Sequence, residues 1–237
     1  AASFPNPART PDAAPPAVAV GARERTLPLT GPAIGGELAV ARGAGAGAGG
    51  RADVVVTGGV DELNPLVAEM LEALGDDGVR GEGAAFLVLE AEEVARSRGA
   101  AVLGRISGAA WRALATRPWG VGRHVASRAI AEALGGAGRP SPEWLYVSAS
   151  GDARRDAWES RVLAHALDGR TVPATSLAGL VGHHAGLGAL HVAAAAWTAR
   201  TGALPTAAGG STRVGGAGLV HGLGRGGGHV ALTVEAA

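Results

Sequence analysis

The chain contains 237 residues, which suits one sizeable domain or two small ones. Its 21 Lys and Arg balance 21 Asp and Glu, and it has no cysteine. This composition excludes the basic footprint of a nucleic-acid or anionic-lipid binder, a disulfide framework, a thiolate metal site and a cysteine nucleophile. No apolar run reaches the roughly 18 residues of a membrane span, and no leader pattern opens the chain. We therefore expect a cytoplasmic protein.

The first segments combine proline with a glycine turn. Residues 1–20 hold five prolines and predict an extended lead-in. Residues 29–41 (LTGPAIGGELAVA) predict a tight turn that enters a small-residue helix, a place where α/β proteins often hold a nucleophile or an anion. The apex residues Pro32, Ala33 and Ile34 offer no nucleophile, so the predicted backbone is site-like and its side chains are inert.

A glycine pattern follows this helix. Gly45, Gly47 and Gly50 match GxGxxG, but they precede the predicted strand 53–57, whereas a dinucleotide site needs its glycines between a strand and a helix. We therefore expect no cofactor there, only a helix end or a loop.

Two acids lie just after the strand 53–57. Asp61 and Glu62 stand at its carboxyl end, where open α/β sheets keep their sites. The favoured interpretation is an N-cap and a first-turn acid for the helix predicted over 65–74. A functional role for these acids is the alternative.

Strands alternate with helices along the rest of the chain, which predicts a layered α/β fold. We place the boundary between two packed halves near residue 108, giving segments 1–108 and 109–237. Residues 209–228 are rich in glycine and predict loops. The expected strands are 81–91, 101–106, 144–149, 171–174 and 230–234, and the expected helices are 92–97, 123–134, 152–167 and 186–200.

Several segments, in this order, resemble the thiolase-fold β-ketoacyl synthases, in particular the type II polyketide ketosynthases and their chain-length-factor partners. The most specific is GEGAAFLVLEAEEVARSRGA (81–100), which is similar to the family's Gly-Glu-Gly, apolar strand and Arg-Gly-Ala helix end. The resemblance implies a thiolase-like layered α-β-α fold, truncated at the N-terminus. The other similar segments are FPN (4–6), RADVVVTGGVDEL (51–63), DARRDAWESRVL (152–163), LVGHHAGLGAL (180–190), GALPT (202–206) and GLGRGGGHVAL (222–232).

The resemblance also implies departures from a catalytic ketosynthase. With Gly58 and Gly59 laid on the family's glycine pair, Ala33 stands at the position of the nucleophilic cysteine. Ser150 replaces the first catalytic histidine of an Ala-His-Gly run. Condensation needs a thiolate to carry the acyl chain and imidazoles to stabilise the enolate, and an alanine methyl cannot form a thioester. We therefore expect no condensing activity from this chain alone.

Two further family positions lie late in the chain. Ala178 stands where the family has a lysine, and the second catalytic histidine is retained as His183, although His184 could hold that register. A metal at this histidine pair is disfavoured, because adjacent side chains point apart. His183 could also be an ordinary buried or helix-terminal histidine. His221 and His229 receive no role.

Three functions remain open, of which a scaffold that binds only acyl carrier protein has the least support, because the near-neutral charge does not favour an acidic carrier. The first is a non-catalytic, chain-length-factor-like subunit that forms a heterodimer with a catalytic ketosynthase and meets acyl carrier protein and the acyl chain through that partner. It would line or stabilise the acyl-chain tunnel, with the strand 54–57 as an interface piece, and it would need no cofactor, metal, nucleic acid or membrane. The second is a diverged acyltransferase or thioesterase that uses Ser150 and His183 with Asp156, although Ser150 lacks a G-x-S-x-G elbow.

Overall fold

The computed structural model describes residues 14–22, 26–30, 33–75, 78–113, 123–138, 141–224 and 227–237. The chain divides into two units, residues 1–30 and 31–237. In the first unit, helix α1 spans Ala14–Ala19, so the extended lead-in expected over residues 1–20 is wrong for these six residues. Pro15 and Pro16 lie in the first turn of α1, where the missing amide hydrogens cost no intrahelical bond.

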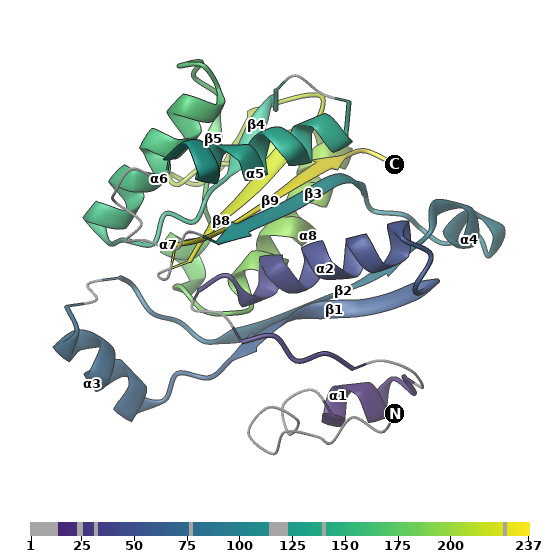
Figure 1. Ribbon diagram of the computed structural model, residues 1–237, viewed down its shortest axis with the longest axis horizontal. Helices are drawn as coiled ribbons and strands as arrows, with labels where there is room; N and C mark the ends of the chain where they lie inside the picture. The colour runs from purple at the N-terminus through teal and green to yellow at the C-terminus, as the bar shows by residue number, and fades with distance from the viewer. Residues whose placement is uncertain are drawn as a thin grey trace. The chain divides into compact units, whose positions relative to one another are not determined.

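A five-stranded mixed sheet forms the centre of the second unit, with strand order β3-β9-β8-β4-β5 (Figure 1). β4 runs parallel to β8 and β5, whereas β9 runs antiparallel to β3 and β8. The loop expected over 209–228 is wrong in part, because β8 lies inside it and all six of its residues are buried. The strands are β3 (Arg105–Ala113), β4 (Trp144–Tyr146), β5 (Ala174–Thr175), β8 (Gly218–Leu223) and β9 (Gly228–Glu235).

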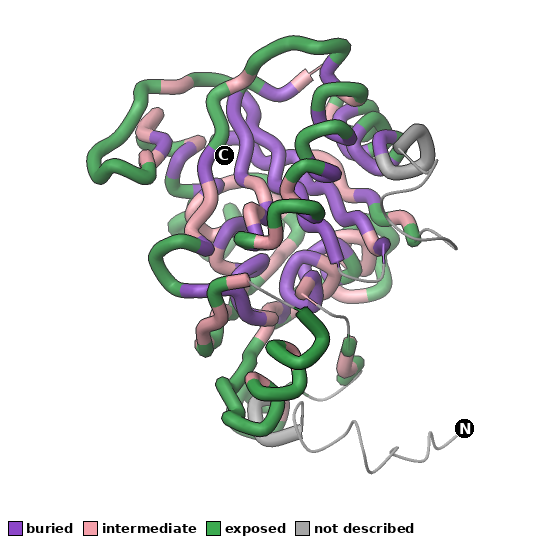
Figure 2. The backbone as a smooth tube through the Cα atoms, turned by 90° about the vertical axis from the view of Figure 1, so that its left-hand side faces the viewer, coloured by how far each residue is buried: buried purple, intermediate pink, exposed green. Residues whose placement is uncertain are grey.

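Helices cover both faces of this sheet. α5 (Arg123–Gly136) and α6 (Ala153–Ala166) lie on one face, and α2 (Gly35–Ala48) and α8 (Leu187–Thr201) lie on the other (Figure 1). The sheet therefore packs between two apolar clusters. Val220, Leu232 and Val234 face the α2 and α8 side, and Leu145, Leu219 and Ala231 face the α5 and α6 side. Figure 2 shows the buried residues gathered in this sheet.

An antiparallel hairpin forms a further layer beyond α2 and α8. It joins β1 (Val54–Asp61) to β2 (Gly83–Glu90), and its inner face packs on the two helices through Ala85, Leu87 and Leu89. Helix α3 (Pro65–Ala73), between the two strands, has no buried residue. Helix α4 (Glu92–Ser97) follows β2. The second unit thus stacks helix, sheet, helix and hairpin, so the expected layered α/β class is confirmed.

The remaining elements are short. They are α7 (Ala178–Val181), β6 (Ala203–Pro205) and β7 (Ser211–Arg213). The strand expected over 101–106 begins later, at Arg105, and continues to Ala113. The proposed boundary near residue 108 falls within β3 and stays a prediction. In the part of the chain that is described, no helix combines the length and apolar character needed to cross a membrane.

Candidate functional site

Ala33 forms the tight turn that opens α2. Its φ is 69°, a left-handed value that L-residues other than glycine seldom adopt and that costs about 1–2 kcal/mol. Ile34 follows at the N-cap, and α2 begins at Gly35. The turn and the helix entry expected here are therefore present, with a methyl group at the strained position. Pro32 lies outside the described residues.

A loop between α7 and α8 closes against this turn. A Cβ on Gly36 would lie 2.6 Å from the Ala185 carbonyl oxygen, and a Cβ on Gly59 of β1 would overlap the same oxygen. Only glycine fits at these two positions, because the backbones themselves are in contact. The glycines of the sequence thus bring the loop that carries His183 and His184 to the N-terminus of α2.

His183 is buried and held by its backbone. Its amide donates to the Val79 carbonyl at 2.7 Å, and its carbonyl accepts from Gly81. Burial, followed by the positive charges of Arg155 and Arg80, lowers the pKa of His183 to about 4. Its ring is therefore neutral at neutral pH, and within the described chain its Nδ1 atom has no hydrogen-bond partner.

His184 points elsewhere. Its Nδ1 accepts from the Gly186 amide at 3.1 Å, and its ring lies against Gly83 of β2. Burial lowers the pKa of His184, partly opposed by Asp61. The two histidines hold separate positions rather than a shared one. Among the described residues, no three His, Asp or Glu side chains converge to hold a metal ion.

Asp61 corrects one expectation. The N-cap of α3 is Asn64, whose side chain accepts from the Leu66 amide. Asp61 instead accepts from the Ala185 amide at 3.1 Å and so ties the end of β1 to the loop beside His184. The favoured N-cap interpretation of Asp61 is therefore wrong.

Ser150 lies in a network at the start of α6. Its hydroxyl donates to Asp156 at 2.8 Å and accepts from Arg155 Nε at 2.7 Å. Asp156 also accepts from the amides of Ser150 and Gly151. Ser150 is 2% exposed. Among the described residues its hydroxyl makes no hydrogen bond to His183. The Ser150 hydroxyl therefore donates its hydrogen bond to a carboxylate and not to an imidazole, so Ser150, His183 and Asp156 do not form a serine triad.

Ala178 begins α7, close to these groups in sequence and buried. Its amide donates to the Ser176 hydroxyl, and its methyl group contributes no charge where the resemblance implies a lysine. The loop 182–186, which carries His183, thus contacts the first turn of α2 just after Ala33, and Arg155, which donates to Ser150, also lowers the pKa of His183.

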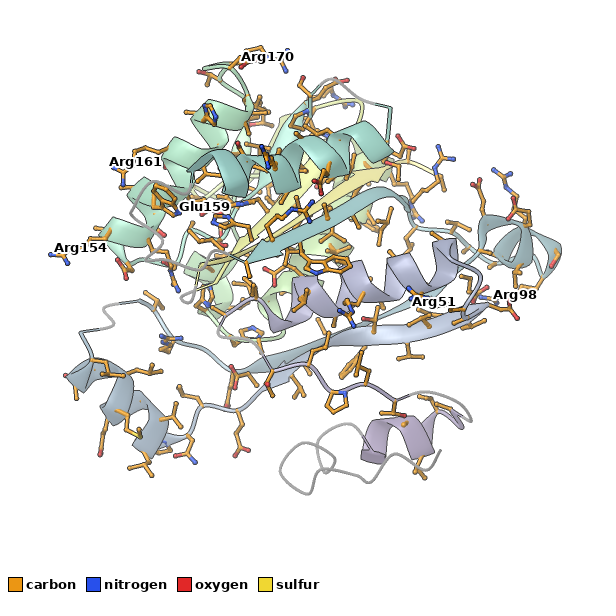
Figure 3. All side chains as sticks on the ribbon, in the orientation of Figure 1. Arg51, Arg98, Arg154, Glu159, Arg161 and Arg170 are labelled. Atoms are coloured by element: carbon orange, nitrogen blue, oxygen red, sulfur yellow. The ribbon has the colours of Figure 1, made fainter. Side chains whose placement is uncertain are left out.

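A buried chain of polar groups was not identified from the sequence. Glu159 accepts from the Ser148 and Ala149 amides and from His221 Nδ1 at 2.7 Å. His221 Nε2 lies 3.1 Å from His229 Nδ1. Burial would raise the pKa of Glu159, but the hydrogen bond and charge attraction of His221 lower it below its ordinary value. Figure 3 shows Glu159 on the inner side of α6, with Arg154 and Arg161 extending outward.

One feature of the sequence could have indicated this buried chain of polar groups. Asp156 and Glu159 are three residues apart on α6, so they share a face, and Asp156 demonstrably points inward to Ser150. The segment DARRDAWESRVL resembles the family, but the resemblance by itself does not indicate that Glu159 is buried.

Two curated relatives align with this chain, although no protein-family profile matches it. The tetracenomycin polyketide synthase ketoacyl synthase alpha subunit of Streptomyces glaucescens is 32% identical over 188 residues, 67% of this chain and 44% of the relative. The oxytetracycline polyketide putative β-ketoacyl synthase 1 of Streptomyces rimosus is 38% identical over 138 residues, 55% of this chain and 32% of the relative. The chain thus spans less than half of these relatives.

Solved structures share the fold. A β-ketoacyl synthase from Burkholderia phymatum superimposes with a TM-score of 0.83 at 21% identity, over 90% of this chain and 62% of that one. The ishigamide ketosynthase/chain length factor gives 0.79 at 22%, over 90% and 61%. A type II PKS acyl-carrier protein in complex with its ketosynthase gives 0.82 at 21%, over 95% and 66%.

In sequence the chain is similar to β-ketoacyl synthases of type II polyketide synthases over part of their length. Its fold is thiolase-like, as the resemblance implied, and it covers part of the ketosynthase structures. Against this similarity the turn at Ala33 stands out, because the sequence contains no cysteine.

Proposed function

We propose that this chain is a non-catalytic, chain-length-factor-like subunit that pairs with an active ketosynthase in type II polyketide or fatty-acid-type biosynthesis. It shapes or stabilises the acyl-chain tunnel of that partner. The observation that carries the proposal is the turn at Ala33, which keeps its strained φ of 69° but presents a methyl group. Because the sequence contains no cysteine, no other thiol can accept an acyl chain.

The state of Ser150 supports the same proposal. The Ser150 hydroxyl uses its one donor hydrogen on Asp156 and accepts a hydrogen bond from Arg155. It can neither donate a second proton to a thioester oxygen nor be activated by His183. The alternative function, acyl transfer or thioester hydrolysis through Ser150 and His183, gains no support from this arrangement.

The hairpin supplies an interface. The apolar side chains of β1 and β2 that point away from α2 are each about half exposed. Together they form a surface that we call the outer hairpin face. A contiguous exposed apolar surface of this kind is typical of an interaction site. The outer hairpin face consists of Val54, Val56 and Val60 of β1 and Phe86 and Val88 of β2.

Co-expression tests the proposal. We would express this chain with an affinity tag beside an untagged ketosynthase from either Streptomyces synthase named above, and measure the purified material by size exclusion with light scattering. The expected result is a one-to-one complex. Folded chain that elutes alone with every ketosynthase tried would contradict the proposal.

A matched pair of variants tests the interface. Val88→Asp places a charge on the outer hairpin face and should abolish co-purification, because burying an unpaired carboxylate is costly. Leu103→Asp changes a comparably exposed leucine outside the hairpin and should leave the complex intact. Equal loss in both variants, or in neither, would place the interface elsewhere.

A further inference from the structure

Glu37 occupies a slot built from two glycines. It lies in the first turn of α2, one turn after Ala33, and is 3% exposed. A Cβ on Gly188 of α8 would overlap its carboxyl group, and a Cβ on Gly222 of β8 would lie 2.9 Å from its Oε1 atom. α2 therefore approaches α8 and β8 at this point because neither neighbour has a side chain there.

The slot suits a neutral acid better than a carboxylate. Burial raises the pKa of Glu37 to about 7; a hydrogen bond from its own backbone amide opposes this shift, and the negative charge of Glu159 adds to it. Within the described chain, Oε2 of Glu37 has no hydrogen-bond partner, and no cation is among the groups that shift its pKa. A carboxylate with one oxygen unsatisfied and no cation beside it is costly to bury.

The positively charged groups on the described elements around α2 are not among those that shift the pKa of Glu37. On β1, Asp61 accepts from the Ala185 amide. On α2 itself, Arg42 lies over the Trp111 ring. The other titratable and charged groups on the surrounding elements include His183 and His184 in the loop 182–186, His191 and Arg200 on α8, Arg155 and Glu159 on α6, His221 on β8, His229 and Glu235 on β9, Glu90 on β2, and Arg105 and Arg112 on β3, where the two arginines pair with Glu235 and Glu132.

We propose that Glu37 is a proton-controlled latch between α2, α8 and β8. The protonated acid fits the glycine slot and holds the Ala33 turn against the loop 182–186. Ionisation favours an opened junction in which water reaches the carboxylate. The latch is independent of the proposed pairing with a ketosynthase. It would make the packing of the α2 N-terminus against α8 and β8 depend on pH.

Hydrogen exchange of the α2 and α8 amides tests the latch. Exchange is followed by mass spectrometry on the whole chain between pH 5 and 8.5 and corrected for the pH dependence of the intrinsic rate. An exposed acid ionises near 4.5 and the slotted acid near 7, so the population of the opened junction should rise about tenfold per pH unit between these values and then level off.

The decisive comparison is with Glu37→Gln, which keeps the shape and removes the ionisation. The buried histidines contribute equally to both proteins, so the difference between them isolates Glu37. Glu72→Gln, on the exposed side of α3, should behave as the unaltered chain does. A rise that persists in Glu37→Gln would overturn the latch.

A second measurement needs no substitution. The side-chain carboxyl carbon of Glu37 can be titrated by NMR in the unaltered protein. A midpoint near 7 supports the latch, and a midpoint near 4.5 would overturn it, whether or not the Gln variant folds.

Discussion

The five-stranded sheet and the β1–β2 hairpin differ in how far other elements cover their faces. Both faces of the sheet are covered, by α5 and α6 on one side and α2 and α8 on the other. Among the described elements, α2 and α8 cover the inner face of the hairpin, and Phe86 and Val88 on its outer face are 52% and 60% exposed. Two-stranded sheets are marginal without further packing. The sheet therefore belongs to the buried core, whereas the outer hairpin face leaves apolar side chains exposed, and this exposed face is where we propose that a partner binds.

The largest effect should come from the buried polar chain behind the sheet. Glu159→Ala removes the partner of His221 and of two backbone amides, and should cost about 3–5 kcal/mol of unfolding free energy. Glu69→Ala, on the exposed α3 beside the hairpin, should change it by less than about 0.5 kcal/mol. Urea unfolding measures both values, and similar costs would remove the contrast between the two regions.

Apolar truncation sharpens the same contrast. Leu232→Ala leaves a cavity between the sheet and α8 and should cost about 2–5 kcal/mol. Val88→Ala on the outer hairpin face should cost no more than about 0.5 kcal/mol in the isolated chain. If Val88→Ala is as damaging as Leu232→Ala in thermal or urea unfolding, the outer face is already packed in solution.

Acid should destabilise the chain through the buried His183 of the loop 182–186. The pKa of His183 is lowered to about 4 from 6.5, so its contribution to stability is complete above 6.5 and is lost as the pH falls towards 4. Between pH 6.5 and 5 the loss should be about 2 kcal/mol. His183→Gln should make this part of the stability profile less steep, measured by urea unfolding at each pH; a slope remains because burial also lowers the pKa of His191 to about 4 and that of His229 to about 3. An unchanged slope would mean that His183 is solvated.

Two glycines of α2 should respond in opposite directions. Gly36→Ala forces a Cβ against the Ala185 carbonyl and the Ala189 amide and should cost about 1–3 kcal/mol. Gly45→Ala meets open space on the same helix and should stabilise the chain by about 0.5–1 kcal/mol. Differential scanning calorimetry of the pair measures both, and a stable Gly36→Ala variant would mean that the loop 182–186 does not touch the turn.

The sequence predicted elements whose pattern is local. Helix α4 matches the expected bounds Glu92–Ser97, and α2 begins after the turn that the glycines indicated. β8 was missed because GLVHGL contains two glycines and a histidine, which are typical of loops, and only its neighbours β4 and β9 make it a strand.

The site was predictable to a similar extent. Ala33, Ser150 and His183 could be chosen because a family pattern marks their positions. Glu159 and Glu37 could not, because acids are usually exposed and their burial depends on contacts distant in sequence. Glu37 in particular needs Gly188 and Gly222, which no local pattern connects to it.

Intact-protein mass spectrometry of the co-purified pair tests the central claim most directly. After incubation with an acyl thioester of acyl carrier protein, the ketosynthase should gain the mass of the acyl group. This chain, with alanine at the turn and no cysteine, should keep its mass unchanged. An acyl adduct on this chain would contradict the account.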